Sequence, residues 1–155
     1  MGDQAKRVRV FLDTSALFAG IWSDAGGARM ILKLGESRAL EIWAGPQVLR
    51  EIEAVIRRQA PGATAFLALL LDRSGIRVVA APSAKSVQEW LPLTGHPGDA
   101  RVLAEACGAA ADYLVTLDKE HLLNRQVLRK AAPFPTGTPG DFLSWYRQQL
   151  LSSRI

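Results

Sequence analysis

RVRVFLDTSALFAGIW, residues 7–22, joins a β-branched apolar run to a helical pattern through a single aspartate. Residues 7–13 are rich in β-branched side chains and end on Asp13, which predicts a short strand. Residues 14–22 then predict a helix. A strand followed at once by a helix is the building unit of α/β folds. We therefore expect an α/β domain whose first strand ends in an acid.

The alternation of strands and helices continues to the end of the chain. Further strands are predicted at residues 41–45, 76–81 and 113–118. Helices are predicted at residues 26–35, 46–58, 65–73, 99–111 and 141–153, and residues 82–98 are interpreted as a polar connection. This order favours a parallel sheet with helices on both faces, because strands linked by helices run in the same direction.

Length and composition limit the class of protein. The 155 residues suit one domain, whose core we place at about residues 7–150. With 48% hydrophobic and 22% charged residues and a net charge of +4, the chain is neither disordered nor fibrous in type. Its single cysteine, Cys107, excludes an internal disulfide framework and a cysteine-cluster zinc site.

No membrane segment is predicted. The longest apolar run, residues 65–71, is far shorter than the roughly 20 residues of a membrane-spanning helix. The N-terminus contains an acid, Asp3, and lacks the apolar region of a secretory signal. We expect a cytoplasmic protein without a membrane partner.

Three aspartates stand where a parallel sheet presents its ligands. Asp13 and Asp118 follow predicted strands, and Asp99 opens the helix before the last of these strands. Ligands of open α/β sheets bind beyond the carboxyl ends of the strands, so these acids are expected to face one crevice. Aspartate is also a favoured helix N-cap, which is the structural alternative at each position. Asp99 shares a helix face with apolar Leu103 and Ala106, which places it at an inward rim.

A fourth acid is chosen between two glutamates of the helix at residues 46–58. Glu53 has Arg50 three positions before it and Arg57 four positions after it, which favours a surface ion pair. Glu51 has apolar neighbours at the corresponding spacings and borders the apolar stripe. We therefore select Glu51 as the candidate site residue, with a surface role as the alternative.

Carboxylates gathered in one crevice need a cation. Two unit charges about 5 Å apart repel by roughly 3 kcal/mol at an effective dielectric near 20. Ligands made only of oxygen select hard ions such as Mg²⁺ or Mn²⁺. Such an ion lowers the pKa of bound water and stabilises charge on a phosphoryl oxygen. The expected chemistry is metal-assisted hydrolysis of a phosphodiester.

An ordered set of segments resembles the PIN-domain family of metal-dependent ribonucleases. The matching segments are VFLDTSAL (10–17), VLREIEAVI (48–56), GDARVLAEA (98–106), LVTLDKEHLL (114–123) and TPGDFLSW (138–145). The resemblance implies a five-stranded parallel sheet in a three-layer α/β/α sandwich. It assigns catalysis and metal binding to Asp13, Glu51, Asp99 and Asp118. It also places the hydroxyls of Ser15 and Thr116 beside the metal.

The same resemblance implies biological partners. Many small members resemble the VapC-like toxins of type II toxin–antitoxin pairs, which cut RNA and are inhibited by an antitoxin protein. RNA is therefore the expected substrate, an antitoxin is the implied partner, and a homodimer is compatible with the sequence. One departure concerns the last strand, because prolines 133, 135 and 139 predict that it is short, at an edge or missing.

Two other functions stay open at this point. A phosphotransferase that forms an aspartyl phosphate also places acids at strand ends, but DTSAL at residues 13–17 lacks the second acid of a DxDxT nucleophile motif. A non-catalytic PIN-like module that binds RNA or protein is the other alternative. His121, three residues after Asp118, is interpreted as a surface or capping residue, since hard ions do not require imidazole.

Overall fold

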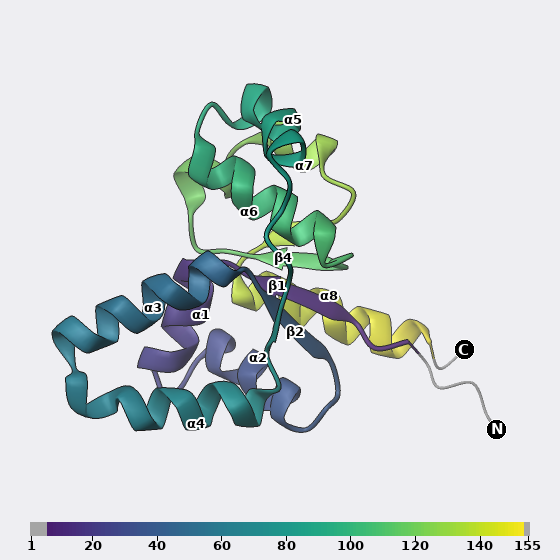
Figure 1. Ribbon diagram of the computed structural model, residues 1–155. Helices are drawn as coiled ribbons and strands as arrows, with labels where there is room; N and C mark the ends of the chain where they lie inside the picture. Colours follow the sequence, from purple (N-terminus) through teal and green to yellow (C-terminus); the bar gives the residue numbers. More distant parts are fainter. Residues whose placement is uncertain (1–5, 154–155) are drawn as a thin grey trace.

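The computed structural model describes residues 6–153 and contains one five-stranded sheet (Figure 1). The strand order is β3-β2-β1-β4-β5, and every neighbouring pair is parallel. The strands are β1 (Arg9–Leu12), β2 (Glu41–Ala44), β3 (Arg77–Val78), β4 (Tyr113–Val115) and β5 (Thr136–Gly137). The order reverses at β1, which lies at the centre between β2 and β4. In an open parallel sheet, the carboxyl end of such a strand is the usual place for a binding crevice.

Helices cover both faces of the sheet, as predicted. One layer contains α1 (Thr14–Trp22), α2 (Gly27–Glu36), α3 (Pro46–Gln59), α4 (Thr64–Ser74) and α8 (Pro139–Ser152). The other contains α5 (Ala84–Thr94), α6 (Pro97–Gly108) and α7 (Gln126–Ala131), drawn above the sheet in Figure 1. Single turns follow α3 (η1, Pro61–Ala63) and β4 (η2, Lys119–Leu123). The three-layer α/β/α fold class is confirmed.

The central strand supplies both halves of the core. Val10 and Leu12 are buried among residues of α1, α2 and α3, while Phe11 is buried against α6 and α7 on the other face. Successive side chains of a strand point to opposite faces, so a run of consecutive apolar residues fits only between two helical layers. The buried apolar run at residues 10–12 of β1 therefore explains why this fold has a helical layer on each side.

The structure differs from the predicted elements in two helices that were not predicted, α5 and the short α7, and in the lengths of the strands predicted at residues 76–81 and 113–118. The connection predicted at residues 82–98 contains a helix, α5, whose N-cap Ser83 accepts a hydrogen bond from the backbone of Ser86. Pro92 lies in the last turn of α5. Because proline is unfavourable inside a helix, the sequence pattern did not predict this helix. Of the strand predicted at residues 76–81, only β3 (Arg77–Val78) forms as a strand, and it pairs with β2.

The last strand confirms the prediction drawn from its prolines. β5 is two residues long, and it forms the edge of the sheet beside β4. α8 follows at once, with a capping box between Thr138 and Asp141. Within the described residues, no helix is both long enough and apolar enough to cross a membrane.

Candidate active site

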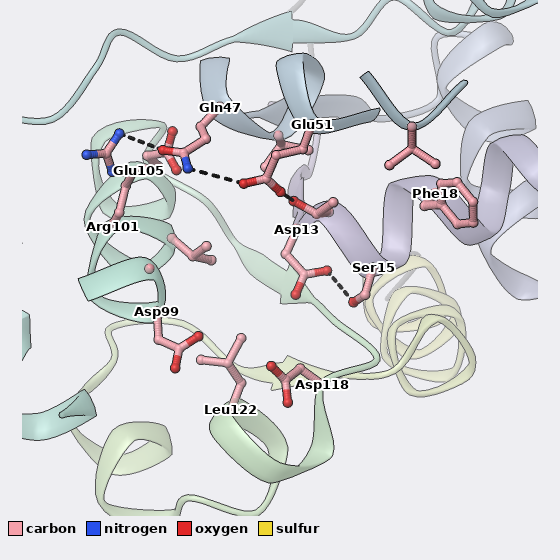
Figure 2. A pocket seen from close by; sticks show the side chains of 15 residues that line it. Asp13, Ser15, Phe18, Gln47, Glu51, Asp99, Arg101, Glu105, Asp118 and Leu122 are labelled. Carbon is pink, nitrogen blue, oxygen red and sulfur yellow. Dashed lines mark hydrogen bonds between the residues drawn. The ribbon is translucent and has the colours of Figure 1, made fainter. Parts of the chain in front are cut away.

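A pocket of about 500 Å³ lies at the carboxyl ends of β1 and β4. It is lined by all four acids selected from the sequence: Asp13, Glu51, Asp99 and Asp118 (Figure 2). These residues come from four places in the chain: the end of β1, helix α3, the first turn of α6, and the end of β4. The fold therefore brings together side chains that are up to 105 positions apart, since 118 − 13 = 105.

Asp13 is the most buried of the four, with 6% of its surface exposed. It caps α1 by accepting a hydrogen bond from the backbone N–H of Ala16 at 3.0 Å. Its Oδ1 also accepts from Ser15 Oγ at 2.7 Å, and its Oδ2 accepts from the hydroxyl of Thr116. Burial raises the pKa of Asp13 above its ordinary value, although these three hydrogen bonds act in the opposite direction. Asp13 is therefore both the N-cap of α1 and a lining residue of the pocket.

The hydroxyls of Ser15 and Thr116 link the ends of β1 and β4. Ser15 Oγ accepts a hydrogen bond from the backbone N–H of Leu117 at 3.0 Å, and Thr116 Oγ1 accepts one from that of Asp118, also at 3.0 Å. Because both hydroxyls donate to Asp13, each one joins the first strand to the segment after the fourth. The orientation of the Asp13 carboxylate is fixed by this network.

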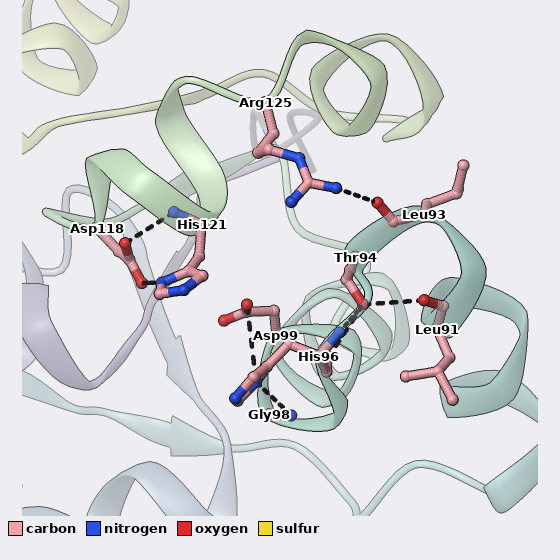
Figure 3. Close-up of polar contacts among 9 residues, drawn as sticks. All are labelled: Leu91, Leu93, Thr94, His96, Gly98, Asp99, Asp118, His121 and Arg125. Atoms are coloured by element: carbon pink, nitrogen blue, oxygen red, sulfur yellow. Dashed lines mark hydrogen bonds and ion pairs between the residues drawn. The ribbon is translucent and has the colours of Figure 1, made fainter.

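Each histidine of the chain contacts one of the pocket's aspartates (Figure 3). Asp118 caps η2 by accepting from the backbone N–H of His121 at 3.0 Å, and His121 Nδ1 lies 3.2 Å from Asp118 Oδ2. This pairing raises the pKa of His121. His96 caps α6 through its ring, and its Nδ1 lies 3.8 Å from Asp99 Oδ2. The centroids of the two rings are 5.8 Å apart, and each ring lies beside one of these aspartates.

One oxygen of Asp99, Oδ2, is buried and accepts no hydrogen bond within residues 6–153. Its charged neighbour is His96 Nδ1 at 3.8 Å, and the side chain as a whole is 15% exposed. Leu103 and Ala106, which share its helix face, are buried in the layer of α6 as the sequence spacing predicts. A buried carboxylate oxygen without a donor is costly, and a ligand that supplies positive charge removes that cost.

Glu51 is oriented by neutral donors. Thr14 Oγ1 donates to Glu51 Oε2 at 2.8 Å, and Gln47 Nε2 donates to Glu51 Oε1 at 3.2 Å. The amide oxygen of Gln47 in turn accepts from Arg101 Nη1 at 2.6 Å. Glu53 instead forms an ion pair with Arg57 on the exposed face of α3, as its spacing predicts. The structure therefore places Glu51, and not Glu53, in the pocket.

Sequence reasoning missed one acid of the pocket, Glu105. It lies on α6, lines the pocket and has only 1% of its surface exposed. Its Oε2 has no hydrogen-bond partner within the described chain. The pKa of Glu105 is raised to about 6, chiefly by burial. Arg101 acts to lower this pKa, Glu51 to raise it and Arg50 to lower it. The available signal was its position between Ala104 and Ala106 in an apolar stretch of helix.

Among residues 6–153, Arg101 is the only lysine or arginine that lines the pocket. Arg101 lies at the pocket wall, beside Gln47. Arg125 and Arg129 instead donate to backbone carbonyls, of Leu93 and of Thr136 respectively, so they stabilise connections between elements. The pocket therefore has a negative interior and one arginine at its wall.

The donor set fits a hard divalent cation. The pocket offers carboxylate and hydroxyl oxygens. Asp99 Oδ2 and Glu105 Oε2 accept no hydrogen bond within residues 6–153, so they are positions where positive charge would be favourable. Within residues 6–153, no group of three or more Asp, Glu, His or Cys side chains is arranged as a ready set of ligands. Mg²⁺ usually binds one or two carboxylates and retains several waters, so it does not require a closed protein shell.

Several solved structures share this fold. VapBC2 from Rickettsia felis, bound to a DNA fragment from their promoter, aligns with a TM-score of 0.62 at 17% identity, over 83% of this chain and 97% of that one. VapC20 of Mycobacterium tuberculosis, a Sarcin-Ricin loop cleaving toxin, aligns with a TM-score of 0.51 at 18% identity, over 74% and 94%. FitAcB from Neisseria gonorrhoeae aligns with a TM-score of 0.54 at 14% identity, over 84% and 97%.

No curated protein matches the chain, but its sequence matches a family model. The model of the PIN domain matches residues 9–120, which extend from β1 to η2 and include all four selected acids. This match covers most of the chain, and the solved structures above agree with it in fold. The chain therefore belongs to the PIN domain family.

Proposed function

We propose that this chain is a Mg²⁺- or Mn²⁺-dependent endoribonuclease that hydrolyses phosphodiester bonds in RNA. The observation that carries the proposal is the shared pocket of Asp13, Glu51, Asp99 and Asp118 at the carboxyl edge of the sheet. Family membership supports the same reaction class, and VapC20, a structural neighbour, is described as a toxin that cleaves the Sarcin-Ricin loop. Nothing in this arrangement favours an aspartate carboxylate over water as the attacking group.

Asp13, Glu51, Asp99 and Asp118 are the residues that would hold the cation. When bound, a divalent cation lowers the pKa of water and stabilises negative charge on a phosphoryl oxygen. Asp13 would keep a fixed orientation, because Ser15 and Thr116 already hold both of its oxygens. A carboxylate held before the ligand arrives loses less conformational entropy on binding.

The polar wall between α3 and α6 would position the RNA. Arg101 lines the pocket and is exposed, so it can meet a phosphate of the substrate. Its hydrogen bond to Gln47 continues to Glu51, so substrate contact and the orientation of Glu51 are linked through one side chain. The chain has 19 basic and 15 acidic residues, a modest excess that suits binding of a polyanion at low salt.

We also infer an antitoxin partner and a role as the toxin of a type II pair. The support is the likeness to VapBC2, a structure in which the proteins are bound to a fragment of their promoter DNA. A short reading frame for a DNA-binding protein directly beside this gene, and co-purification of its product with this chain, are the expected findings. A chain that is expressed alone without harm and recovers no partner would contradict the toxin role.

The nuclease proposal is tested with purified protein and single-stranded RNA. Cleavage is expected with MgCl₂ or MnCl₂ and is expected to stop in EDTA. Asp13→Asn and Asp99→Asn are expected to lower the rate by at least about 100-fold, the scale of removing one main catalytic group. Glu53→Gln is the matched control, because Glu53 lies on the exposed face of α3. Undiminished cleavage by both aspartate variants, or in EDTA, would disprove the assignment.

A further inference from the structure

Glu105 is a buried acid that the proposed catalytic set does not use. It has 1% exposure, and its Oε2 has no hydrogen-bond partner in the described part of the chain. Buried polar atoms in native proteins almost always have a partner, and a charged side chain is rarely buried alone. A partner that the protein itself does not provide is therefore needed to explain this residue.

The backbone before α3 is shaped around the Glu105 carboxylate. A Cβ added at Gly45 would overlap both oxygens of Glu105, and these are its nearest neighbours. Gly45 has an ordinary extended conformation, with φ −82° and ψ 155°, so its backbone does not require glycine. The space that a side chain would fill is occupied by the carboxylate, and α3, which carries Glu51, begins at the next residue.

The charges around Glu105 leave it without a direct cationic partner. Arg101 is four residues earlier on α6, yet its guanidinium donates to Gln47, and no ion pair of Glu105 occurs within residues 6–153. Glu51, on the facing helix, adds negative charge and raises the pKa of Glu105, while Arg101 and Arg50 lower it. Glu51 and Glu105 thus line the same wall of the pocket, and the guanidinium of Arg101 at this wall donates to Gln47.

We propose that Glu105 is a fifth carboxylate ligand of the pocket, and that together with Glu51 it binds a divalent cation at the wall formed by α3 and α6. The inference rests on the proposed function, because it concerns the same pocket. A cation there supplies the partner that Glu105 Oε2 lacks and offsets the repulsion between the two glutamates. Two carboxylates and several waters are a sufficient set for Mg²⁺ or Mn²⁺.

The test measures Mn²⁺ binding rather than catalysis. The full chain, stripped with EDTA and dialysed, is titrated with MnCl₂ in a calorimeter, as wild type, Glu105→Gln and the control Glu53→Gln. Glu105→Gln is expected to lose one Mn²⁺ equivalent or to weaken it at least 10-fold, while the control keeps the wild-type isotherm. Glu51→Gln is expected to weaken Mn²⁺ binding at least as much, because Glu51 also belongs to the proposed catalytic set. The double variant is expected to lose no more than Glu51→Gln alone, because the cation at this wall needs both side chains.

The outcomes separate this inference from the proposed function. An unchanged isotherm for Glu105→Gln, with Mn²⁺ binding lost in Asp13→Asn, would overturn the role of Glu105 and keep the nuclease proposal. No Mn²⁺ binding by the wild type would overturn both. A change only in which nucleotide is cleaved, with Mn²⁺ binding intact, would assign Glu105 to base recognition and also overturn the inference. Glu105→Asp, which keeps the charge but withdraws the oxygens, is expected to weaken binding similarly and serves if the Gln variant misfolds.

Discussion

The hydroxyl of Thr116 donates a hydrogen bond to Oδ2 of Asp13, across 103 positions of sequence. Both residues are buried, and each stands just beyond the end of its strand, β1 or β4. The same Thr116 oxygen accepts from the backbone N–H of Asp118 at 3.0 Å. One hydroxyl therefore sets the relative position of two of the proposed cation ligands.

Thr116→Val is expected to lower both stability and cleavage. Valine keeps the shape of threonine but leaves Asp13 Oδ2 and the Asp118 N–H without this partner, at a cost of about 1–3 kcal/mol in the free energy of unfolding. Urea unfolding in EDTA measures that change, and RNA cleavage in MgCl₂ measures the effect on the site. Thr116→Ser keeps the hydroxyl and is expected to lose only about 1 kcal/mol for its methyl group. Equal behaviour of the two variants would show that this hydrogen bond has no effect.

Asp99→Asn is expected to have opposite effects on stability without and with cation. Asp99 lies in the first turn of α6 and accepts no capping bond from the backbone. Its Oδ2 accepts no hydrogen bond within the described residues and lies 3.8 Å from His96 Nδ1. Neutralising it in EDTA removes charge repulsion in the pocket and is expected to raise the free energy of unfolding by about 1 kcal/mol. In excess MnCl₂ the wild type is expected to become the more stable, because cation binding stabilises the folded state. Melting curves under both conditions test this, and a lower melting temperature for the variant in EDTA would contradict it.

Glu105→Gln is expected to stabilise the cation-free protein in a pH-dependent way. The pKa of Glu105 rises from 4.5 to about 6 on folding, so the folded chain binds this proton more tightly, and ionisation costs stability as the pH rises through that window. At 1.36 kcal/mol per pKa unit, the cost is about 2 kcal/mol above pH 6 and absent below pH 4.5. The variant is therefore expected to gain about 2 kcal/mol at pH 8 and almost nothing at pH 4.

The measurement is urea unfolding in EDTA at a series of pH values. The charged groups that act on Glu105 are Arg101, Glu51 and Arg50, and all three are kept in the variant. Glu53→Gln, an exposed position, serves as the control and is expected to show no such gain. A gain for Glu105→Gln that is the same at pH 4 and pH 8 would have a cause other than this ionisation.

Gly45→Ala is expected to destabilise the protein through Glu105 alone. The added methyl group would overlap the Glu105 carboxylate, and overpacking of this kind costs about 1–3 kcal/mol. In a Glu105→Ala background the methyl group has space, and the substitution is expected to be nearly neutral. A double-mutant cycle of unfolding free energies measures the coupling. Additive effects of the two changes would mean that Gly45 is required for another reason.

The positions of the strand-end acids were predictable because a short apolar strand before an aspartate leaves few structural alternatives. Asp13 directly follows β1, and Asp118 comes three residues after the end of β4. Glu51 was chosen over Glu53 because Glu53 has arginines at helical spacing. These are local patterns. The parallel sheet brings the residues together in space, because its strands end at the same edge. The PIN domain match spans all of these positions.

Glu105 and α5 were missed for the same kind of physical reason. Arg101 stands four residues before Glu105, a spacing typical of a surface ion pair, but packing against Gly45 buries the carboxylate and Arg101 turns to Gln47. α5 contains Pro92, and its residues are mostly exposed, so its pattern resembles a connection. In both cases contacts between distant segments override the local signal, and no sequence window includes them.

The central place of β1 has a consequence for protein synthesis. Its partner β4 begins at Tyr113, so the last wall of the pocket is translated about a hundred residues after the first. A ribosome therefore releases the N-terminal half of the domain while the carboxylates of α6 and η2 do not yet exist. The pocket is therefore complete only after most of the chain has been translated, and any activity that needs all four acids begins late in synthesis.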